Sequence, residues 1–161
     1  MAKRHQSLIG LSHDHHHGLA LALRLQLGDR AMLVDGWTHD RRKQAEKVVK
    51  FFDEELAAHF ALEEEVLFPV IVCHTTDASA LVTTLISQHR QMEKLAGRLR
   101  SETDVEQVLL EMGRLLEMHI RLEERELFPQ FEQHVPETVA REVGQLLDRS
   151  QKSPTPMTRR Q

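Results

Sequence analysis

An eleven-residue pattern occurs twice in this chain and limits the folds open to it. HFALEEEVLFP begins at His59, and HIRLEERELFP begins sixty residues later at His119. Each copy places a histidine and, four residues on, a glutamate on an otherwise apolar helical stripe. An unpaired carboxylate is costly to bury, so each glutamate needs a partner inside the core. An internal duplication is the simplest explanation of the repeat.

Apolar residues recur at steps of three and four along four long segments, as expected for amphipathic α-helices. The segments cover approximately residues 8–28, 45–67, 81–99 and 105–127, and a shorter amphipathic segment follows Pro136. Gly28 suits the position just past the first helix, whereas Pro69 should stop or kink the second. Strand-like alternation is absent from the sequence. We therefore predict an all-α bundle with a short additional C-terminal helix that docks on it.

Length and charge favour a single domain without nucleic-acid or membrane partners. The chain has 161 residues and a net charge of -4 with histidine neutral, so it lacks the basic surplus that such partners require. The N-terminal apolar run is too short for a signal peptide, and Cys73 is the only cysteine. We expect a cytoplasmic protein with one domain over residues 1–150 and a disordered polar tail over residues 151–161. Nothing in the sequence identifies a protein partner.

The two pairs of histidine and glutamate predict a metal site. Residues four apart on an α-helix differ by only about 40° around its axis, so His59 and Glu63 point the same way. His119 and Glu123 form the second such pair. Either pair alone is common as a surface ion pair, but both lie on apolar stripes and share their flanking residues. A metal ion would supply the cation that the buried carboxylates need.

Histidines on the other two long helices complete the predicted donor set. His15 and His89 occupy the core-facing stripes of the first and third helices, and in the HDHHH cluster we choose His15 over His16, the alternative. A lone histidine on an apolar face is more often a hydrogen-bonded core residue than a ligand. A histidine on the apolar face of each of four helices favours metal binding instead. The set suits two ions, each bound by two histidines and bridged by Glu63 and Glu123.

The order H, HxxxE, H, HxxxE resembles that of the hemerythrin-like, or HHE, domain family. The similarity runs roughly from Leu8 to Phe131, and LFP after each HxxxE makes the combination specific. The resemblance implies an up-down-up-down four-helix bundle and a non-haem di-iron centre with oxo or hydroxo and carboxylate bridges. Two departures weigh against reversible oxygen carriage. Glu93 stands where oxygen carriers have a fifth histidine, and Glu123 belongs to HxxxE where they have an aspartate in HxxxxD.

Three other carboxylates near the predicted site have open roles. Glu93 lies one turn after His89, where it either binds iron, which we favour, or pairs with Arg90. Glu64 and Glu124 point about 100° away from the residues before them, so we expect solvated or supporting carboxylates there rather than bridges.

Three classes of function fit these residues. The first is a protein that binds or senses oxygen, nitric oxide or peroxide, since imidazole and carboxylate ligands suit iron and fewer than six ligands leave a position open. The second is a redox enzyme that acts on peroxide or nitric oxide. The third is an iron-handling protein or an iron-responsive switch, in which metal binding folds the bundle. We favour the first.

Overall fold

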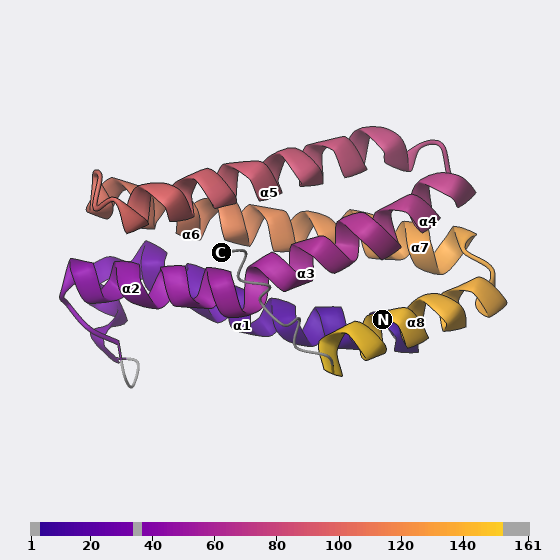
Figure 1. Ribbon diagram of the computed structural model, residues 1–161, viewed down its shortest axis with the longest axis horizontal. Helices are drawn as coiled ribbons and strands as arrows, with labels where there is room; N and C mark the ends of the chain where they lie inside the picture. The colour runs from indigo at the N-terminus through magenta and orange to yellow at the C-terminus, as the bar shows by residue number, and fades with distance from the viewer. Residues whose placement is uncertain (1–3, 34–36, 153–161) are drawn as a thin grey trace, which may run out of the picture.

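The structure, a computed structural model, describes residues 4–33 and 37–152, and every regular element in these ranges is helical (Figure 1). Four long helical stretches lie side by side and alternate in direction, which confirms the all-α, up-down-up-down bundle. They are α1 (Ile9–Leu27), residues 41–74, α5 (Ala78–Arg100) and residues 105–134. Residues 153–161 of the predicted tail lie outside the described residues. No described helix combines the length and the apolar character needed to cross a bilayer.

The second and fourth stretches contain five-residue π-helical segments between their α-helical parts. In order, the second stretch consists of α2 (Arg41–Phe51), η3 (Phe52–Leu56), α3 (Ala57–Leu62), η4 (Glu63–Leu67) and α4 (Phe68–His74). The fourth consists of α6 (Val105–Leu122), η5 (Glu123–Leu127) and α7 (Phe128–His134). The repeat thus produces the same local structure twice, because η4 and η5 each begin at the glutamate of an HxxxE pair.

The sequence predicts that Pro69 stops or kinks the second helix, and the first of these alternatives is wrong. The helix continues through Pro69 to His74, with the proline in the first turn of α4. Proline lacks an N–H group and its ring clashes with the carbonyl four residues earlier in a regular α-helix. The wider turn of η4 directly before α4 changes that hydrogen-bonding register, and such π-bulges are frequent at functional sites. The end of α1 is as predicted, because Gly28 follows it with φ of 54°.

Two apolar clusters fill the bundle, one on each side of the layer that holds the histidines and glutamates. One cluster includes Leu25, Val48 and Met112, and the other includes Leu11, Phe68 and Phe131. These residues lie before and after the histidine of each helix along the chain. The polar layer is therefore enclosed at both ends by dry, packed side chains.

The C-terminal helix α8 (Glu137–Lys152) docks on the bundle, as predicted. Its apolar face is buried in the second cluster through Ala140, Val143 and Leu147. Gly144 lies so close to the N-terminal segment that an added Cβ would be 2.9 Å from the Ser7 side chain. The helix therefore covers the end of the bundle from which α1 starts.

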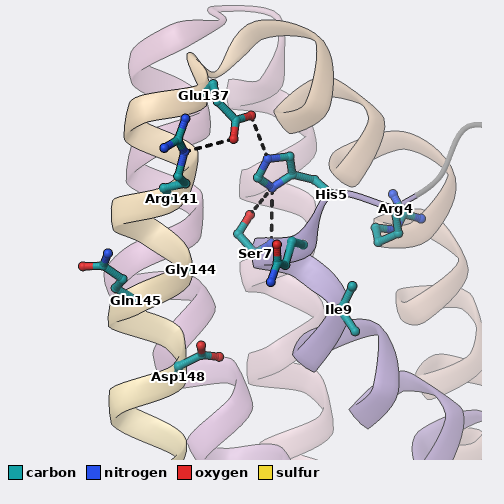
Figure 2. A pocket seen from close by; sticks show the side chains of 10 residues that line it. Arg4, His5, Ser7, Ile9, Glu137, Arg141, Gly144, Gln145 and Asp148 are labelled. Atoms are coloured by element: carbon teal, nitrogen blue, oxygen red, sulfur yellow. Dashed lines mark hydrogen bonds and ion pairs between the residues drawn. The ribbon is translucent and has the colours of Figure 1, made fainter.

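A hollow of about 940 Å³ lies between α8 and the N-terminal segment (Figure 2). Polar side chains at one end of it pair with each other. His5 contacts Glu137 at 3.0 Å, and Arg141 donates to the same carboxylate at 3.1 Å. These contacts tie the N-terminal segment to α8 across a groove on the surface of the protein.

Helices α1 and α6 approach each other closely at two glycines. A Cβ added to Gly113 would lie 2.8 Å from the Leu25 side chain and 3.1 Å from the Ala22 carbonyl oxygen. A Cβ added to Gly18 would lie 2.7 Å from the end of the Ile120 side chain. The absence of side chains at these positions lets the two helices bring their polar residues together in the core.

Candidate metal centre

Six buried donor residues from four helical stretches meet in one layer of the bundle. None is more than 6% exposed. Among the described residues, their donor atoms form two groups, in each of which all four atoms lie within 4.8 Å of one another: His15, His59, Glu63 and Glu123; and Glu63, His89, His119 and Glu123. The structure therefore brings together the four predicted histidines and the two predicted glutamates, and both glutamates belong to both groups.

The histidines face each other in pairs through their Nε2 atoms. His15 Nε2 and His59 Nε2 are 3.2 Å apart, and His89 Nε2 and His119 Nε2 are 3.1 Å apart. Two nitrogens that each bind one ion at about 2.1 Å, at right angles to each other, are about 3 Å apart. Both pairs therefore have the spacing of two ligands on a shared cation.

Glu63 lies between the two histidine pairs. Its Oε1 is 2.9 Å from His59 Nε2, and its Oε2 is 3.4 Å from His89 Nε2. Despite these short ion-pair distances, neither oxygen has the alignment of a hydrogen bond with any described residue. Burial raises the pKa of the carboxyl, but the charge on His59, together with the contacts of His59 and His89 and the charge on His119, outweighs burial and holds this pKa well below its usual range. A buried, ionised carboxylate without hydrogen bonds is a strong reason to expect a cation.

Glu123 occupies the matching place on the fourth helical stretch. Its Oε2 is 3.1 Å from His15 Nε2 and 3.5 Å from His119 Nε2, and both oxygens again lack hydrogen bonds within the described residues. Burial, together with the negative charge of Glu63, raises its pKa to about 7. A cation between the two carboxylates would offset both the lost hydration and the repulsion.

The outer nitrogens of two histidines are held by the residues that follow the glutamates. His15 Nδ1 donates to Glu124 at 2.8 Å, and His89 Nδ1 donates to Glu64 at 2.8 Å. An ionised carboxylate only accepts hydrogen bonds, so Nδ1 carries the proton and Nε2 offers its lone pair to the centre. Glu64 and Glu124 are thus supporting carboxylates, which is one of the two roles predicted for them.

The outer nitrogens of the other two histidines contact residues that sequence reasoning missed. His59 Nδ1 lies 3.3 Å from Asp14, and His119 Nδ1 donates to Gln88 Oε1 at 2.8 Å. Both partners directly precede the histidines of α1 and α5. That position in the sequence was the available signal, because a residue beside a ligand can reach the ligand of the next helix.

Burial and charge set opposite pKa shifts at two of these histidines. Burial lowers the pKa of His15, but its contacts with Glu123 and Glu124 outweigh burial and raise this pKa to about 9. Burial lowers the pKa of His119 to about 3, and its partner Gln88 has no charge to oppose the effect. In the metal-free protein His15 therefore carries a proton that a metal ion must displace, whereas His119 is already neutral.

Two residues considered from the sequence lie outside the donor groups. His16, the alternative to His15, is exposed on α1. Glu93 is 62% exposed at its side chain, and its carboxylate is 3.7 Å from Arg90. The structure therefore does not place Glu93 among the donors, contrary to the role we favoured, and it gives the alternative pairing with Arg90. His74 and His134 end α4 and α7, and both are exposed.

A small cavity adjoins the donor layer. Its volume is about 10 Å³, which is near the smallest space that holds a water molecule. Its lining includes His15 and His59 together with Gly18, Leu56 and Ile120. The space is mostly apolar, so it suits a small molecule with little charge.

Comparison with known families agrees with this geometry. The model of the hemerythrin HHE cation binding domain matches residues 7–131, a range that includes all six donors. No curated protein matched the sequence. The buried histidines and glutamates fit a metal site of the kind that the family description implies. On its fold, its donor set and this match, the chain belongs to the hemerythrin HHE cation-binding family.

Proposed function

We propose that this chain is a non-haem di-iron protein that binds or senses a small ligand, namely oxygen, nitric oxide or peroxide. The observation that carries the proposal is that Glu63 and Glu123 belong to both four-donor groups. A carboxylate that faces a histidine of each pair is suited to bridge two ions. Carboxylate-bridged di-iron sites are commonly built from inward-facing side chains in the cores of four-helix bundles.

The donor types support iron. Both groups contain only imidazole nitrogens and carboxylate oxygens, a mixture that non-haem iron accepts readily. Cys73 is exposed on α4 and belongs to neither group, so a thiolate-rich zinc or iron–sulfur site is not supported. Bound iron would supply an open coordination position and the ability to exchange electrons, because each group offers four protein donors and six-coordinate iron needs more.

The surroundings support a small ligand rather than a large substrate. The cavity of about 10 Å³ lies against His15 and His59 and is close to the smallest space that holds one water molecule, so it excludes any large substrate. Its wall includes Gly18, where an added methyl group would meet Ile120 at 2.7 Å. Apolar walls favour neutral diatomic molecules over strongly hydrated ions.

Elemental analysis and the near-ultraviolet spectrum of the freshly purified protein test the centre itself. We expect two irons per chain and the charge-transfer bands of a bridged ferric pair. Glu63→Ala removes a donor from both groups and should weaken the binding of both irons. His119→Ala removes a donor from one group only and should weaken the binding of one iron. Zinc in place of iron, or two irons fully retained in Glu63→Ala, would overturn the proposal.

Ligand binding is tested with nitric oxide on the ferrous protein and azide on the ferric protein. Gly18→Ala puts a methyl group at the wall of the cavity, where its closest contact is the flexible end of the Ile120 side chain, so it should weaken the binding of both ligands without changing the iron content. Gly97→Ala, a surface change on α5, is the matched control. Equal affinity in wild type and Gly18→Ala would show that ligands do not use this cavity.

A redox enzyme acting on peroxide or nitric oxide is the second candidate. The observation that favours it is the exposure of Glu93, which leaves the group of His89 and His119 without a fifth protein donor. Steady consumption of peroxide by the iron-loaded protein, lost in His119→Ala, would favour turnover over simple binding.

A further inference from the structure

The four residues that hold the outer nitrogens of the histidines come from equivalent positions in the two halves of the chain. Glu64 and Glu124 each follow a glutamate of an HxxxE pair and support the histidines of α5 and α1. Asp14 and Gln88 each precede a histidine on α1 or α5 and support the histidines of the HxxxE pairs. The duplication therefore extends to the residues around the donors.

At one of these two pairs of equivalent positions, the two residues differ in charge. Asp14 brings a carboxylate to His59, whereas Gln88 brings an uncharged amide to His119. At the other pair of positions both partners are glutamates, each at 2.8 Å. The group of His15 and His59 thus has two carboxylate partners, and the group of His89 and His119 has one.

A hydrogen bond from Nδ1–H to a carboxylate makes the opposite nitrogen a stronger donor to a metal ion, because negative charge is pushed onto the ring. An amide oxygen does so much less, since it has only a partial charge. Changing such an outer partner typically alters metal affinity by about 10- to 100-fold.

We infer that Asp14 and Gln88 are positioning residues that make the two metal positions unequal. Compared at a pH where the histidines are neutral before metal binds, the position that contains His59 binds its ion more tightly, and the position that contains His119 releases its ion first. This inference rests on the proposed two-iron centre and adds an order to its binding and release.

The surroundings of the two residues predict which of them has the larger effect. Asp14 is 39% exposed at its side chain, so water screens part of its charge. Gln88 is only 5% exposed and lies inside the bundle. A carboxylate introduced at position 88 would act through a less polar medium and should change metal affinity more than loss of the carboxylate at position 14.

The test is anaerobic titration of the Fe(II)-loaded protein with a ferrous chelator, with the iron that remains on the protein measured at each concentration. Wild type should lose its irons in two separate steps of one ion each. Gln88→Glu should move the first step to a chelator concentration at least about tenfold higher. Asp14→Asn should move the second step to lower concentration by a smaller factor, and Asp14→Glu should restore it.

Two controls match the changes in charge. Gln91→Glu adds the same charge to the exposed face of α5, and Glu55→Gln removes an exposed charge beside the small cavity, but neither residue contacts a donor histidine. Both should leave the two steps unchanged. Tightening by Gln88→Glu is the decisive result, because a purely structural role of the buried amide would predict loosening.

The possible failures are distinguishable. Fewer than two irons in wild type would overturn the proposed centre. Two irons lost together in one step, or steps that neither Gln88→Glu nor Asp14→Asn moves, would overturn the inferred inequality and leave the centre intact. If Gln88→Glu fails to fold, as judged by its far-ultraviolet circular dichroism, the partly exposed Asp14→Asn variant still decides the question.

Discussion

Replacing Gly113 by alanine should destabilise the bundle, although the same change elsewhere in a helix stabilises it. Gly113 lies in α6 where that helix meets α1, and its added Cβ would be 2.8 Å from Leu25 Cβ and 3.1 Å from the Ala22 carbonyl oxygen. Neither atom is the end of a flexible side chain. The two helices must therefore move apart by several tenths of an ångström to accept the methyl group.

The magnitude follows from two opposing effects. Glycine costs a helix interior about 1 kcal/mol relative to alanine, so the substitution alone is favourable. Overpacking a filled core costs about 1–3 kcal/mol. Gly97 in α5 is the matched position, because no described atom would lie within 4 Å of its added Cβ. Gly97→Ala should gain the helical preference without the clash, so the difference between the two variants measures the clash at about 1–3 kcal/mol.

Urea denaturation of the metal-free proteins, followed by circular dichroism, measures both free energies of unfolding. Because α1 carries His15 and the stretch after α6 carries Glu123, the displacement should also lengthen their 3.1 Å contact and weaken metal binding. Gly113→Ala should therefore bind Fe(II) more weakly than Gly97→Ala. Equal stabilisation by the two alanines would refute the reasoning, because it would mean that α1 and α6 are not in close contact at this point.

Three further outcomes are expected. The pKa of His15 is about 9, so below that pH an incoming ion must displace its proton. Metal affinity should therefore rise between pH 7 and pH 9, by up to about tenfold per pH unit for this one proton. An affinity that does not change with pH would contradict the raised pKa of His15. Removing metal with a chelator should lower the melting temperature, because metal at 100 times its Kd adds about 2.7 kcal/mol to the free energy of unfolding; identical melting curves would argue against a buried site. Glu93→Ala should keep the full iron content, because that carboxylate is 62% exposed and close to Arg90; loss of one iron would restore Glu93 as a ligand.

The donor residues could be predicted from the sequence because their geometry is local. Four residues make slightly more than one helical turn, so the direction from His59 to Glu63 is set by the helix itself. The apolar stripe then says which way the pair faces. His15 was chosen over His16 on the same ground, and the structure buries the first and exposes the second.

The role of Glu93 could not be predicted in this way, because one turn of separation limits only where a side chain starts. A long carboxylate at that point can turn inward to a cation or outward to an arginine. In the structure Arg90, three residues earlier on α5, lies within 3.7 Å and the carboxylate faces solvent. The effect of Pro69 could not be decided between a stop and a kink for a related reason, since helical periodicity does not distinguish a helix that ends at a proline from one that continues past it through a π turn.

The supporting residues show where local patterns reach their limit. Asp14 and Gln88 stand next to predicted ligands in the sequence, but their partners are identified only when the next helix brings a histidine nitrogen to each of them, at 3.3 and 2.8 Å. Those contacts depend on the rotation of one helix relative to its neighbour, which no single-helix pattern contains. Because the two halves of the bundle are duplicates, however, the rotation between neighbouring helices in one half indicates the rotation in the other half. A difference between residues at equivalent positions, such as Asp14 and Gln88, can then be understood as a chemical difference between two otherwise similar metal positions.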